Sequence, residues 1–464
     1  MSAVARLMLA SGVAVSGSDV RDSPTVQALR AAGARVHIGH APEQVAGADT
    51  VVVSSAIRED NVELVAARAA GARILHRSQG LAALAGDRRV VAVAGANGKS
   101  TTTSMLVVAL TAACADPTFA SGADIPQVGG NAALGSGPDF VVEADESDGS
   151  FVVYRPDVAV VTNVQPDHLD HYGDFAGVRA AYRRFVDSMA PAGLLVACLD
   201  DPGAAELAEY ARSTGRVVRT YGFDPGADVR LGEPTATEQG GRAVLTADGA
   251  RLDLVVPVPG RHNLENAAGA YAALTAGCGL APEVALAGLA GFTGAARRFE
   301  SHGEHAGVRV VDDYAHNAPK VTAAVRTGAE VAGRRGGRLI VVFQPHLFSR
   351  TRDFADGFAD GLSGADEVVL LDIYPAREDP IDGVSSELIA GPLRAVMGEG
   401  VVHRPESFDA AVDTVLAVAR PGDVVMTIGA GDVTVLAPRI ATGLETASAA
   451  AVPNSTARGP EGEI

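Results

Sequence analysis

The chain has 464 residues, of which 47% are apolar and 20% charged, and its formal net charge is −18. Such an acidic chain lacks the basic surface that grips nucleic acid or an anionic membrane, so we expect small-molecule partners whose phosphates are bound locally. Its three cysteines lack the spacing of a disulfide framework or a zinc site, and no apolar run approaches the about 20 residues of a membrane span, which favours a cytoplasmic protein without membrane insertion.

Apolar, β-rich runs alternate with Ala- and Arg-rich helical stretches along the chain. This alternation predicts an α/β fold of parallel sheets covered by helices, in which ligands bind beyond the carboxyl ends of strands. Composition places domain junctions near residues 86 and 296, which gives domains 1–86, 87–296 and 297–442 and a disordered tail at 443–464. The expected strand runs are residues 50–57, 88–95, 157–164, 338–346, 367–374 and 423–431.

The run at 88–95 enters a glycine-rich turn and then a helix. Glycines let backbone N–H groups face an anion, a helix N-terminus adds its dipole, lysine reaches the terminal phosphates, and a serine hydroxyl can bind magnesium. Lys99 is one of only two lysines among 38 basic residues, the other being Lys320. The pattern G-x-x-G-K-[ST] predicts an ATP-binding loop, and the alternative is a purely structural turn. The loop residues are Gly95, Ala96, Asn97, Gly98, Lys99, Ser100 and Thr101.

Polar groups suited to a metal follow two further strand runs. Magnesium takes carboxylates together with nucleotide phosphate oxygens, so a carboxylate at a strand end beside a phosphate-binding loop can complete its shell. The alternative for each group is a solvated loop. The first group is Glu143, Asp145, Glu146 and Asp148, and the second is Asn163, Asp167, His168 and Asp170.

Three more segments are candidate binding turns, although each could also be an ordinary surface loop. Two asparagines three residues apart lie near one face of a predicted helix. Arginines after a strand can grip a carboxylate or phosphate through two hydrogen bonds. The residues are Asn263 and Asn266 in the first segment, Asp312, Asp313 and His316 in the second, and His346, Arg350 and Arg352 in the third.

Taken in order, seven segments of the chain resemble the Mur ligase family. They are GANGKSTTTSM, EADESDGSF, TNVQPDHLDHY, GRHNLENAAGA, RRFE, DDYAHN and FQPHLFSRTRDF, and the segments VSGSD, HIGH and VVVSSAI further resemble the alanine-adding branch. The resemblance implies three domains: a nucleotide-sugar domain, a central P-loop ATPase domain and a carboxy-terminal domain that closes on the amino acid. It also implies that ATP and Mg²⁺ activate the carboxylate of UDP-N-acetylmuramate as an acyl phosphate, which L-alanine attacks during peptidoglycan synthesis.

The same resemblance implies roles for individual residues. Lys99 would stabilise the transferring phosphoryl group, Ser100 and Glu143 would hold one magnesium ion, and His168 would help to hold a second. Arg350 would act in catalysis on the alanine side. Of the remaining residues, Asn263, Asn266, Arg298 and Asp313 would bind ATP, Ser54 and Ser55 would bind the sugar nucleotide, and His346 would bind the amino acid together with Arg350.

The chain departs from the family pattern at four places. Ala96 and Asn97 stand where the branch has Thr-His, Asn317 and Ala318 replace His-Pro, and Leu347 replaces an arginine. The chain starts at Met1 and Ser2, which match the last two residues of a glycine-rich loop that follows the family's first strand, so the true start stays an open question.

Two interpretations of Leu347 follow. Either it lines the amine pocket and alters the choice of amino acid, or it faces the core while Arg352 or Lys320 supplies the missing charge. Two other functions also stay open: a divergent paralogue that joins another carboxylate to another amine, and a non-catalytic nucleotide-binding relic.

Overall fold

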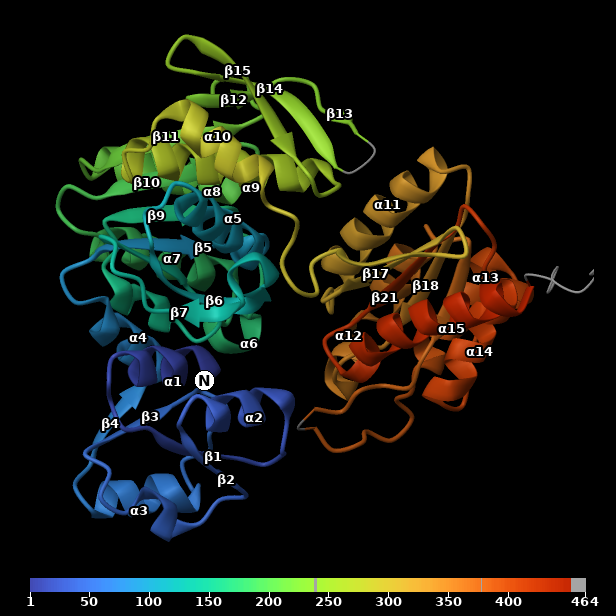
Figure 1. The fold of residues 1–464 in the computed structure, drawn as a ribbon, viewed down its shortest axis with the longest axis horizontal. Helices are drawn as coiled ribbons and strands as arrows, with labels where there is room; N and C mark the ends of the chain where they lie inside the picture. The colour runs from blue at the N-terminus through green and yellow to red at the C-terminus, as the bar shows by residue number, and fades with distance from the viewer. Residues whose placement is uncertain (238–239, 377, 452–464) are drawn as a thin grey trace, which may run out of the picture. The chain divides into compact units, whose positions relative to one another are not determined.

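The structure is a computed structural model that describes residues 1–237, 240–376 and 378–451. The chain divides into two compact units, Met1–Ala295 and Ala296–Ile464, and Figure 1 labels most of their helices and strands. None of the described helices is long and apolar enough to cross a lipid bilayer.

The first unit begins with short helices and two separate pairs of parallel strands. β1 (Ser16–Asp19) pairs with β2 (Arg35–Ile38), and β3 (Thr50–Val53) pairs with β4 (Arg73–His76). Each helix buries a narrow apolar stripe, as α1 does with Leu7, which is fully buried. The helices are α1 (Ser2–Ala10), α2 (Pro24–Ala31), α3 (Val62–Ala69) and α4 (Arg77–Ala85), with a 3-10 turn η1 (Pro42–Val45).

An eleven-stranded sheet forms the centre of the described part of this unit. Its order is β13-β14-β12-β11-β10-β9-β5-β8-β6-β7, and β15 pairs with β14. The inner strands β5 (Arg89–Ala94), β8 (Asp139–Glu143), β9 (Val158–Val161) and β10 (Leu194–Cys198) are mostly apolar and buried, because helices cover both faces of a parallel sheet. The strands next to them are β6 (Thr118–Ile125), β7 (Gly130–Ala133) and β11 (Val217–Gly222).

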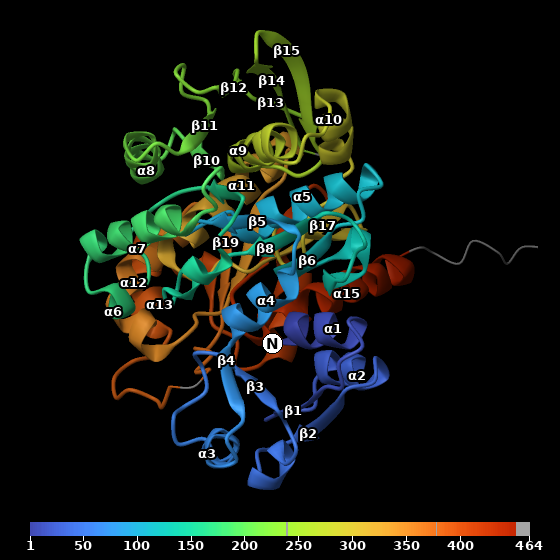
Figure 2. The same cartoon turned by 90° about the vertical axis from the view of Figure 1, so that its left-hand side faces the viewer.

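Helices from distant parts of the sequence cover this sheet. α5 packs against α9 and α10, whereas α7 packs against α8, and Figure 2 shows α5 and α10 to one side of the central strands and α7 and α8 to the other. The helices are α5 (Lys99–Ala112), α6 (Leu169–Tyr172), α7 (Phe175–Ser188), α8 (Pro202–Ser213), α9 (Arg261–Ala272) and α10 (Pro282–Ala290), with the 3-10 turns η2 (Pro126–Val128) and η3 (Ser150–Tyr154) and a π-helical turn η4 (Ala273–Gly277).

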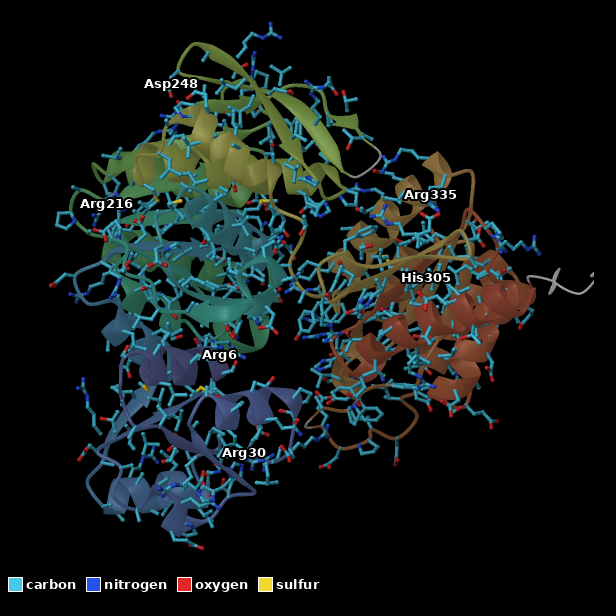
Figure 3. All side chains as sticks on the ribbon, in the orientation of Figure 1. Arg6, Arg30, Arg216, Asp248, His305 and Arg335 are labelled. Carbon is cyan, nitrogen blue, oxygen red and sulfur yellow. The ribbon has the colours of Figure 1, made fainter. Side chains whose placement is uncertain are left out.

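The alternation of strands and helices that we predicted for the whole chain fails between β12 and β15. Here β14 pairs with β12, β13 and β15 in antiparallel fashion. The two residues between β14 and β15, Asp248 and Gly249, have φ angles of 51° and 80° and form a tight turn that cannot cross over to a parallel strand. Asp248 stands at the tip of this hairpin (Figure 3). The strands are β12 (Val229–Leu231), β13 (Thr235–Ala236), β14 (Gly241–Ala247) and β15 (Ala250–Val256).

The second unit is built on a six-stranded sheet in its described part, with the order β16-β17-β21-β18-β19-β20. Among the described strands of this second sheet, only β16 and β17 pair in antiparallel fashion. The strands are β16 (Glu300–His305), β17 (Val308–Asp313), β18 (Leu339–Phe343), β19 (Glu367–Leu370), β20 (Val402–His403) and β21 (Val424–Ile428).

Two apolar clusters lie on the faces of this second sheet, one with α11 (Ala318–Arg334), α12 (Phe348–Leu362) and α13 (Glu387–Met397), the other with α14 (Phe408–Val418) and α15 (Leu436–Ala451). Two 3-10 turns, η5 (Glu399–Val401) and η6 (Asp432–Val435), complete the unit. α15 continues to Ala451 and buries Leu444, so ordered helix extends into the segment 443–464 that composition marked as a disordered tail. Residues 452–464 lie outside the described residues.

Candidate functional site

The predicted phosphate-binding loop connects β5 to the N-terminus of α5. Gly95 and Gly98 have φ angles of 139° and 86°, and a Cβ at either would lie 2.0 Å from Thr162 Oγ1 or 2.5 Å from Asn266 Oδ1 respectively. The loop therefore requires glycine at both positions. Asn163, two residues after the end of β9, holds the loop: its Oδ1 accepts from Asn97 N at 2.9 Å and its Nδ2 donates to Asn97 O at 3.0 Å.

Lys99 is held in an ion pair that sequence alone did not assign. Its Nζ lies 2.8 Å from Glu146 Oε2 and donates to Gly95 O at 2.6 Å. The two side chains are 15% and 3% exposed. Burial lowers the pKa of Lys99, but the Glu146 carboxylate outweighs burial and leaves that pKa above its ordinary value. The Lys99 side chain therefore stays protonated at neutral pH, at the start of α5.

Ser100 and Glu143, the two residues expected to hold a magnesium ion, lie within hydrogen-bonding distance of each other. Ser100 Oγ donates to Glu143 Oε1 at 3.0 Å, and the backbone N–H of Gly122 donates to Oε2 at 2.8 Å. No cluster of three or more His, Cys, Asp or Glu suited to a metal occurs among the described residues. A hydroxyl and one carboxylate are nevertheless a fitting pair for magnesium, which uses few protein ligands when phosphate oxygens and water complete its shell.

His168 lies beside Glu146. Its Nε2 is 3.8 Å from Glu146 Oε1 and 4.0 Å from Asp167 Oδ2, and its φ of 54° places it in the left-handed region just before α6. The hydroxyl of Tyr172 donates to the backbone carbonyl of Glu146. Glu146 therefore joins the loop lysine to the turn that carries His168. The side chain of Asp170 lies outside the described residues.

The two asparagines of α9 are both buried, at 6% and 7% exposure. Asn266 faces the phosphate-binding loop at Gly98, whereas Asn263 Nδ2 donates to Pro259 O at 2.6 Å, just before its own helix. Asn266 thus contacts the loop directly, and Asn263 fixes the start of the helix that presents it.

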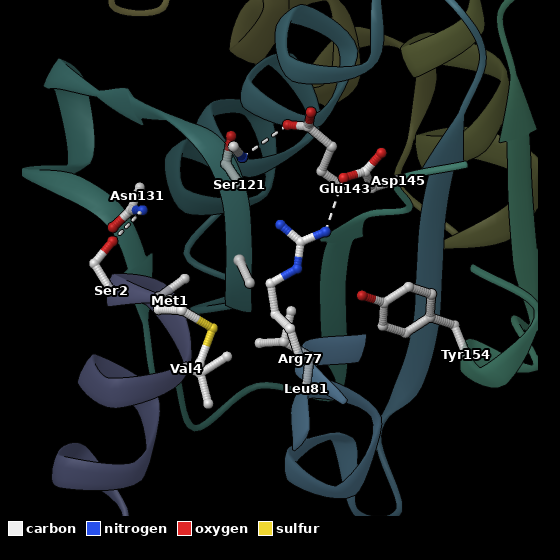
Figure 4. Close-up of a pocket in the computed structure, with 13 residues that line it drawn as sticks. Met1, Ser2, Val4, Arg77, Leu81, Ser121, Asn131, Glu143, Asp145 and Tyr154 are labelled. Carbon is white, nitrogen blue, oxygen red and sulfur yellow. Dashed lines mark hydrogen bonds and ion pairs between the residues drawn. The ribbon is translucent and has the colours of Figure 1, made fainter. Parts of the chain in front are cut away.

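A cavity of about 200 Å³ adjoins Glu143, and sequence reasoning did not find it. Arg77, at the start of α4, projects into it and donates through Nη2 to Asp145 at 2.8 Å (Figure 4). Burial raises the pKa of Asp145, but the Arg77 hydrogen bond and the charge of Lys99 outweigh burial and hold that pKa well below its usual range. The cavity is lined by Met1, Ser2, Ala3, Val4, Arg77, Leu81, Ala120, Ser121, Gly122, Asn131, Glu143, Asp145 and Tyr154.

A second ion pair lies beside the pairing of Arg77 with Asp145. His76 Nε2 is 3.2 Å from Asp148 Oδ2, so two consecutive residues at the start of α4 contact the acidic turn after β8. Ser54 and Ser55 lie in the turn at the carboxyl end of β3, where Ser54 O accepts from Ile57 N at 3.0 Å, and neither lines the cavity.

In the second unit, Arg297 and Arg298 lie close to one aromatic ring, that of the residue after Asp313. The guanidinium groups of Arg297 and Arg298 are 4.9 Å and 4.8 Å from the centre of the Tyr314 ring. Asp313 accepts from the backbone N–H groups of Phe299 and Ala315, each at 2.9 Å, and burial raises its pKa despite the nearby Arg298 charge.

Arg297 anchors this cluster. It pairs with the fully buried Asp312 at 3.2 Å and donates to Gly429 O at 2.5 Å. Arg297 belongs to the RRFE segment, but from the sequence only its neighbour Arg298 was given a role.

The alanine-side residues of the prediction also meet in the second unit. Arg350 Nη1 donates to His316 O at 3.3 Å, and the rings of His316 and His346 are 6.3 Å apart. Burial, followed by the charge of Lys320, lowers the pKa of His316 to about 3, so its ring is neutral at physiological pH.

Leu347 is half-buried with a φ of 74°, and its N–H donates to Tyr374 O at 2.9 Å. Arg352 pairs with Asp353 on the surface, at 2.7 Å. Its guanidinium is thus engaged by a neighbour on the same helix.

Comparisons with known proteins cover nearly the whole chain. Residues 1–89 match the Mur ligase family catalytic domain, 93–274 the Mur ligase middle domain, and 297–431 the Mur ligase glutamate ligase domain. The UDP-N-acetylmuramate–L-alanine ligase of Kineococcus radiotolerans is 53% identical over 95% of this chain and 93% of its own, and that of Paenarthrobacter aurescens is 52% identical over 96% and 94%. The crystal structure of the UDP-N-acetylmuramate–alanine ligase of Thermotoga maritima is 27% identical, with a TM-score of 0.82 over 96% of this chain and 97% of that one.

Proposed function

Because the chain belongs to the Mur ligase family, we propose that it joins L-alanine to UDP-N-acetylmuramate at the expense of ATP, in the cytoplasmic stage of peptidoglycan synthesis. The supporting observation is the arrangement of Lys99, Ser100 and Glu143 at adjacent strand ends, in a chain more than half identical to ligases of that name. A nucleotide-binding relic is disfavoured because these polar groups are in place.

The residues of the loop suit the first chemical step. The carboxylate oxygen of the acceptor attacks the γ-phosphorus of ATP and ADP leaves, which requires charge stabilisation more than covalent catalysis. Lys99 would exchange Glu146 for the transferring phosphoryl group, and backbone N–H groups of the loop would face the phosphates. Ser100 and Glu143 would hold Mg²⁺, with His168 near a second ion. The metal supplies screening of phosphate charge when bound.

In the second step the amine of L-alanine attacks the acyl carbon, phosphate leaves, and the nitrogen loses a proton. Arg350 can grip the α-carboxylate through a bidentate pair. The neutral ring of His316, whose Nδ1 donates to Tyr314 O at 2.9 Å, leaves Nε2 as an acceptor on this side. We assign His346 to the same pocket.

The remaining assignments follow the family resemblance. Arg298, Asp313, Asn263 and Asn266 would bind the nucleotide, and Ser54 and Ser55 the sugar nucleotide. We propose domains at 1–86, 87–296 and 297–442 for sugar-nucleotide binding, ATP binding and amino-acid binding.

The test is ADP release by the purified chain with each substrate omitted in turn, and with glycine, serine and valine in place of alanine. We expect release to require ATP, Mg²⁺, UDP-N-acetylmuramate and an amino acid together, and mass spectrometry to show the alanyl amide. Faster turnover with another amino acid would instead support the divergent paralogue. Release of ADP that ignores UDP-N-acetylmuramate would contradict the proposal.

A further inference from the structure

The cavity beside Glu143 has an uneven distribution of charge. Glu143 and Asp145 form one wall, and Arg77 carries the sole basic side chain among the described residues that line it. Figure 4 shows the guanidinium of Arg77 rising from α4 toward these carboxylates, with Tyr154 to one side and Ser121 to the other. The cavity thus brings an arginine from the first part of the unit to the proposed magnesium carboxylate.

An acceptor carboxylate that reacts with ATP must come close to this wall. Glu143, Asp145 and Glu146 already place three carboxylates near the phosphate-binding loop, and a fourth would be repelled at short range. Lys99 is committed to the phosphate side, so a second cation is needed on the acceptor side.

Arg77 can supply this cation while it keeps its hydrogen bond to Asp145. It holds Asp145 through Nη2, and a guanidinium has five N–H donors in a fork that matches a carboxylate. Its side chain is 31% exposed, which leaves it accessible from the cavity. His76, the preceding residue, is fixed against Asp148 and caps α4, so the arginine starts from a rigid point.

We propose that Arg77 binds the acceptor carboxylate of the nucleotide sugar in this cavity and presents it for phosphorylation. This assignment rests on the proposed function. It makes Arg77 a determinant of the choice between a nucleotide sugar that carries a carboxylate and one that does not.

Calorimetric binding of two nucleotide sugars to the full chain tests the proposal. UDP-N-acetylmuramate carries the carboxylate, and UDP-N-acetylglucosamine has the same diphosphate but lacks that group. For Arg77→Gln we expect affinity for the first to fall about tenfold to a hundredfold, as for a lost charge-assisted hydrogen bond, and affinity for the second to stay within about twofold. Arg77→Lys should fall between Gln and the native residue because it keeps the charge but not the fork.

Arg73→Gln is the matched control, since Arg73 is an exposed arginine of the preceding strand that does not line the cavity. It should bind both sugars as the native chain does. In turnover, Arg77→Gln should raise the KM for UDP-N-acetylmuramate and leave the KM for ATP unchanged.

Equal losses for the two sugars in Arg77→Gln would overturn the proposal, because they would indicate a diphosphate contact or a folding defect. Unchanged affinity for both would overturn it as well. If Arg77→Gln weakens binding of UDP-N-acetylmuramate but not of UDP-N-acetylglucosamine, and the native chain makes no amide with any amino acid, the proposed function fails while the carboxylate assignment holds. Failure of the native chain to bind UDP-N-acetylmuramate would overturn both.

Discussion

Replacing Lys99 should cost the protein stability as well as activity, because its partner is buried. Glu146 is 3% exposed and lies 2.8 Å from the ammonium group. Removing one member of a buried ion pair costs about 3–5 kcal/mol, since the other charge is left without compensation. The side chain of Lys99 is 15% exposed, so water can reach this position and partly compensate the Glu146 charge when the ammonium group is removed. We therefore expect Lys99→Met to lower the free energy of unfolding by about 3 kcal/mol, the lower end of that range.

The double variant Lys99→Met/Glu146→Gln separates the two effects. With both charges removed, the free energy of unfolding should return to within about 1 kcal/mol of the native value. Activity should stay at least about a hundredfold down in both variants, because neither restores the cation at the transferring phosphoryl group.

Urea denaturation followed by circular dichroism measures stability in this chain, which contains no tryptophan for fluorescence, and ADP release measures activity. Lys320→Met removes the other lysine and serves as the control for loss of a lysine in the stability measurement alone, since Lys320 lies near His316 on the alanine side. A single variant as stable as the native chain, or a double variant no more stable than the single one, would refute the reasoning about the buried pair.

Three further predictions concern the metal, the histidine and the amine. Glu143→Ala should raise the Mg²⁺ concentration needed for half-maximal ADP release while UDP-N-acetylmuramate affinity changes less, and equal losses in both assays would argue against a metal contact. His316 has a pKa near 3 in the folded chain, against about 6.5 for an unfolded histidine. Its contribution to the stability of the folded state should be present above pH 6.5 and should be lost as the pH falls toward 3, by at most about 1.4 kcal/mol per pH unit. NMR titration of the His316 ring should show no protonation between pH 8 and about 5. Arg350→Gln should raise the KM for L-alanine at least about tenfold and leave that for ATP unchanged, whereas parallel rises would point to a general distortion.

Sequence was sufficient for the phosphate-binding loop because its chemistry is local. Strand, glycines, lysine and helix follow one another directly, and the structure shows the left-handed glycines that this pattern requires. The meeting of Ser100 with Glu143 followed from strand ends sharing one edge of a parallel sheet. Their roles toward ATP and magnesium stay predictions.

Burial and long-range pairing were beyond the sequence. Glu146 was visible as one of four acidic residues in a turn, but nothing in that turn distinguishes the one that is 3% exposed from its neighbours. Arg77 belongs to no motif, and its contact with Asp145 joins residues 68 positions apart. Such contacts depend on how α4 packs, which local spacing does not specify.

The hairpin of β14 and β15 could have been predicted from the sequence. Asp248 and Gly249 separate two runs with alternating apolar residues, which is typical of a hairpin, but the prediction of parallel sheets for the whole chain left no place for it.

The buried ion pair of Lys99 with Glu146 should also affect chemical labelling of the chain. Amine-acylating reagents modify neutral amines and leave arginine untouched, and the amines of this chain are its amino terminus and the two lysines Lys99 and Lys320. With Lys99 paired, charged and largely shielded, Lys320 should take up reagent before Lys99 does. Acylation at Lys99 would then report the opening of the ion pair itself, and its rate with and without nucleotide would give the fraction of time that the ammonium group spends away from Glu146.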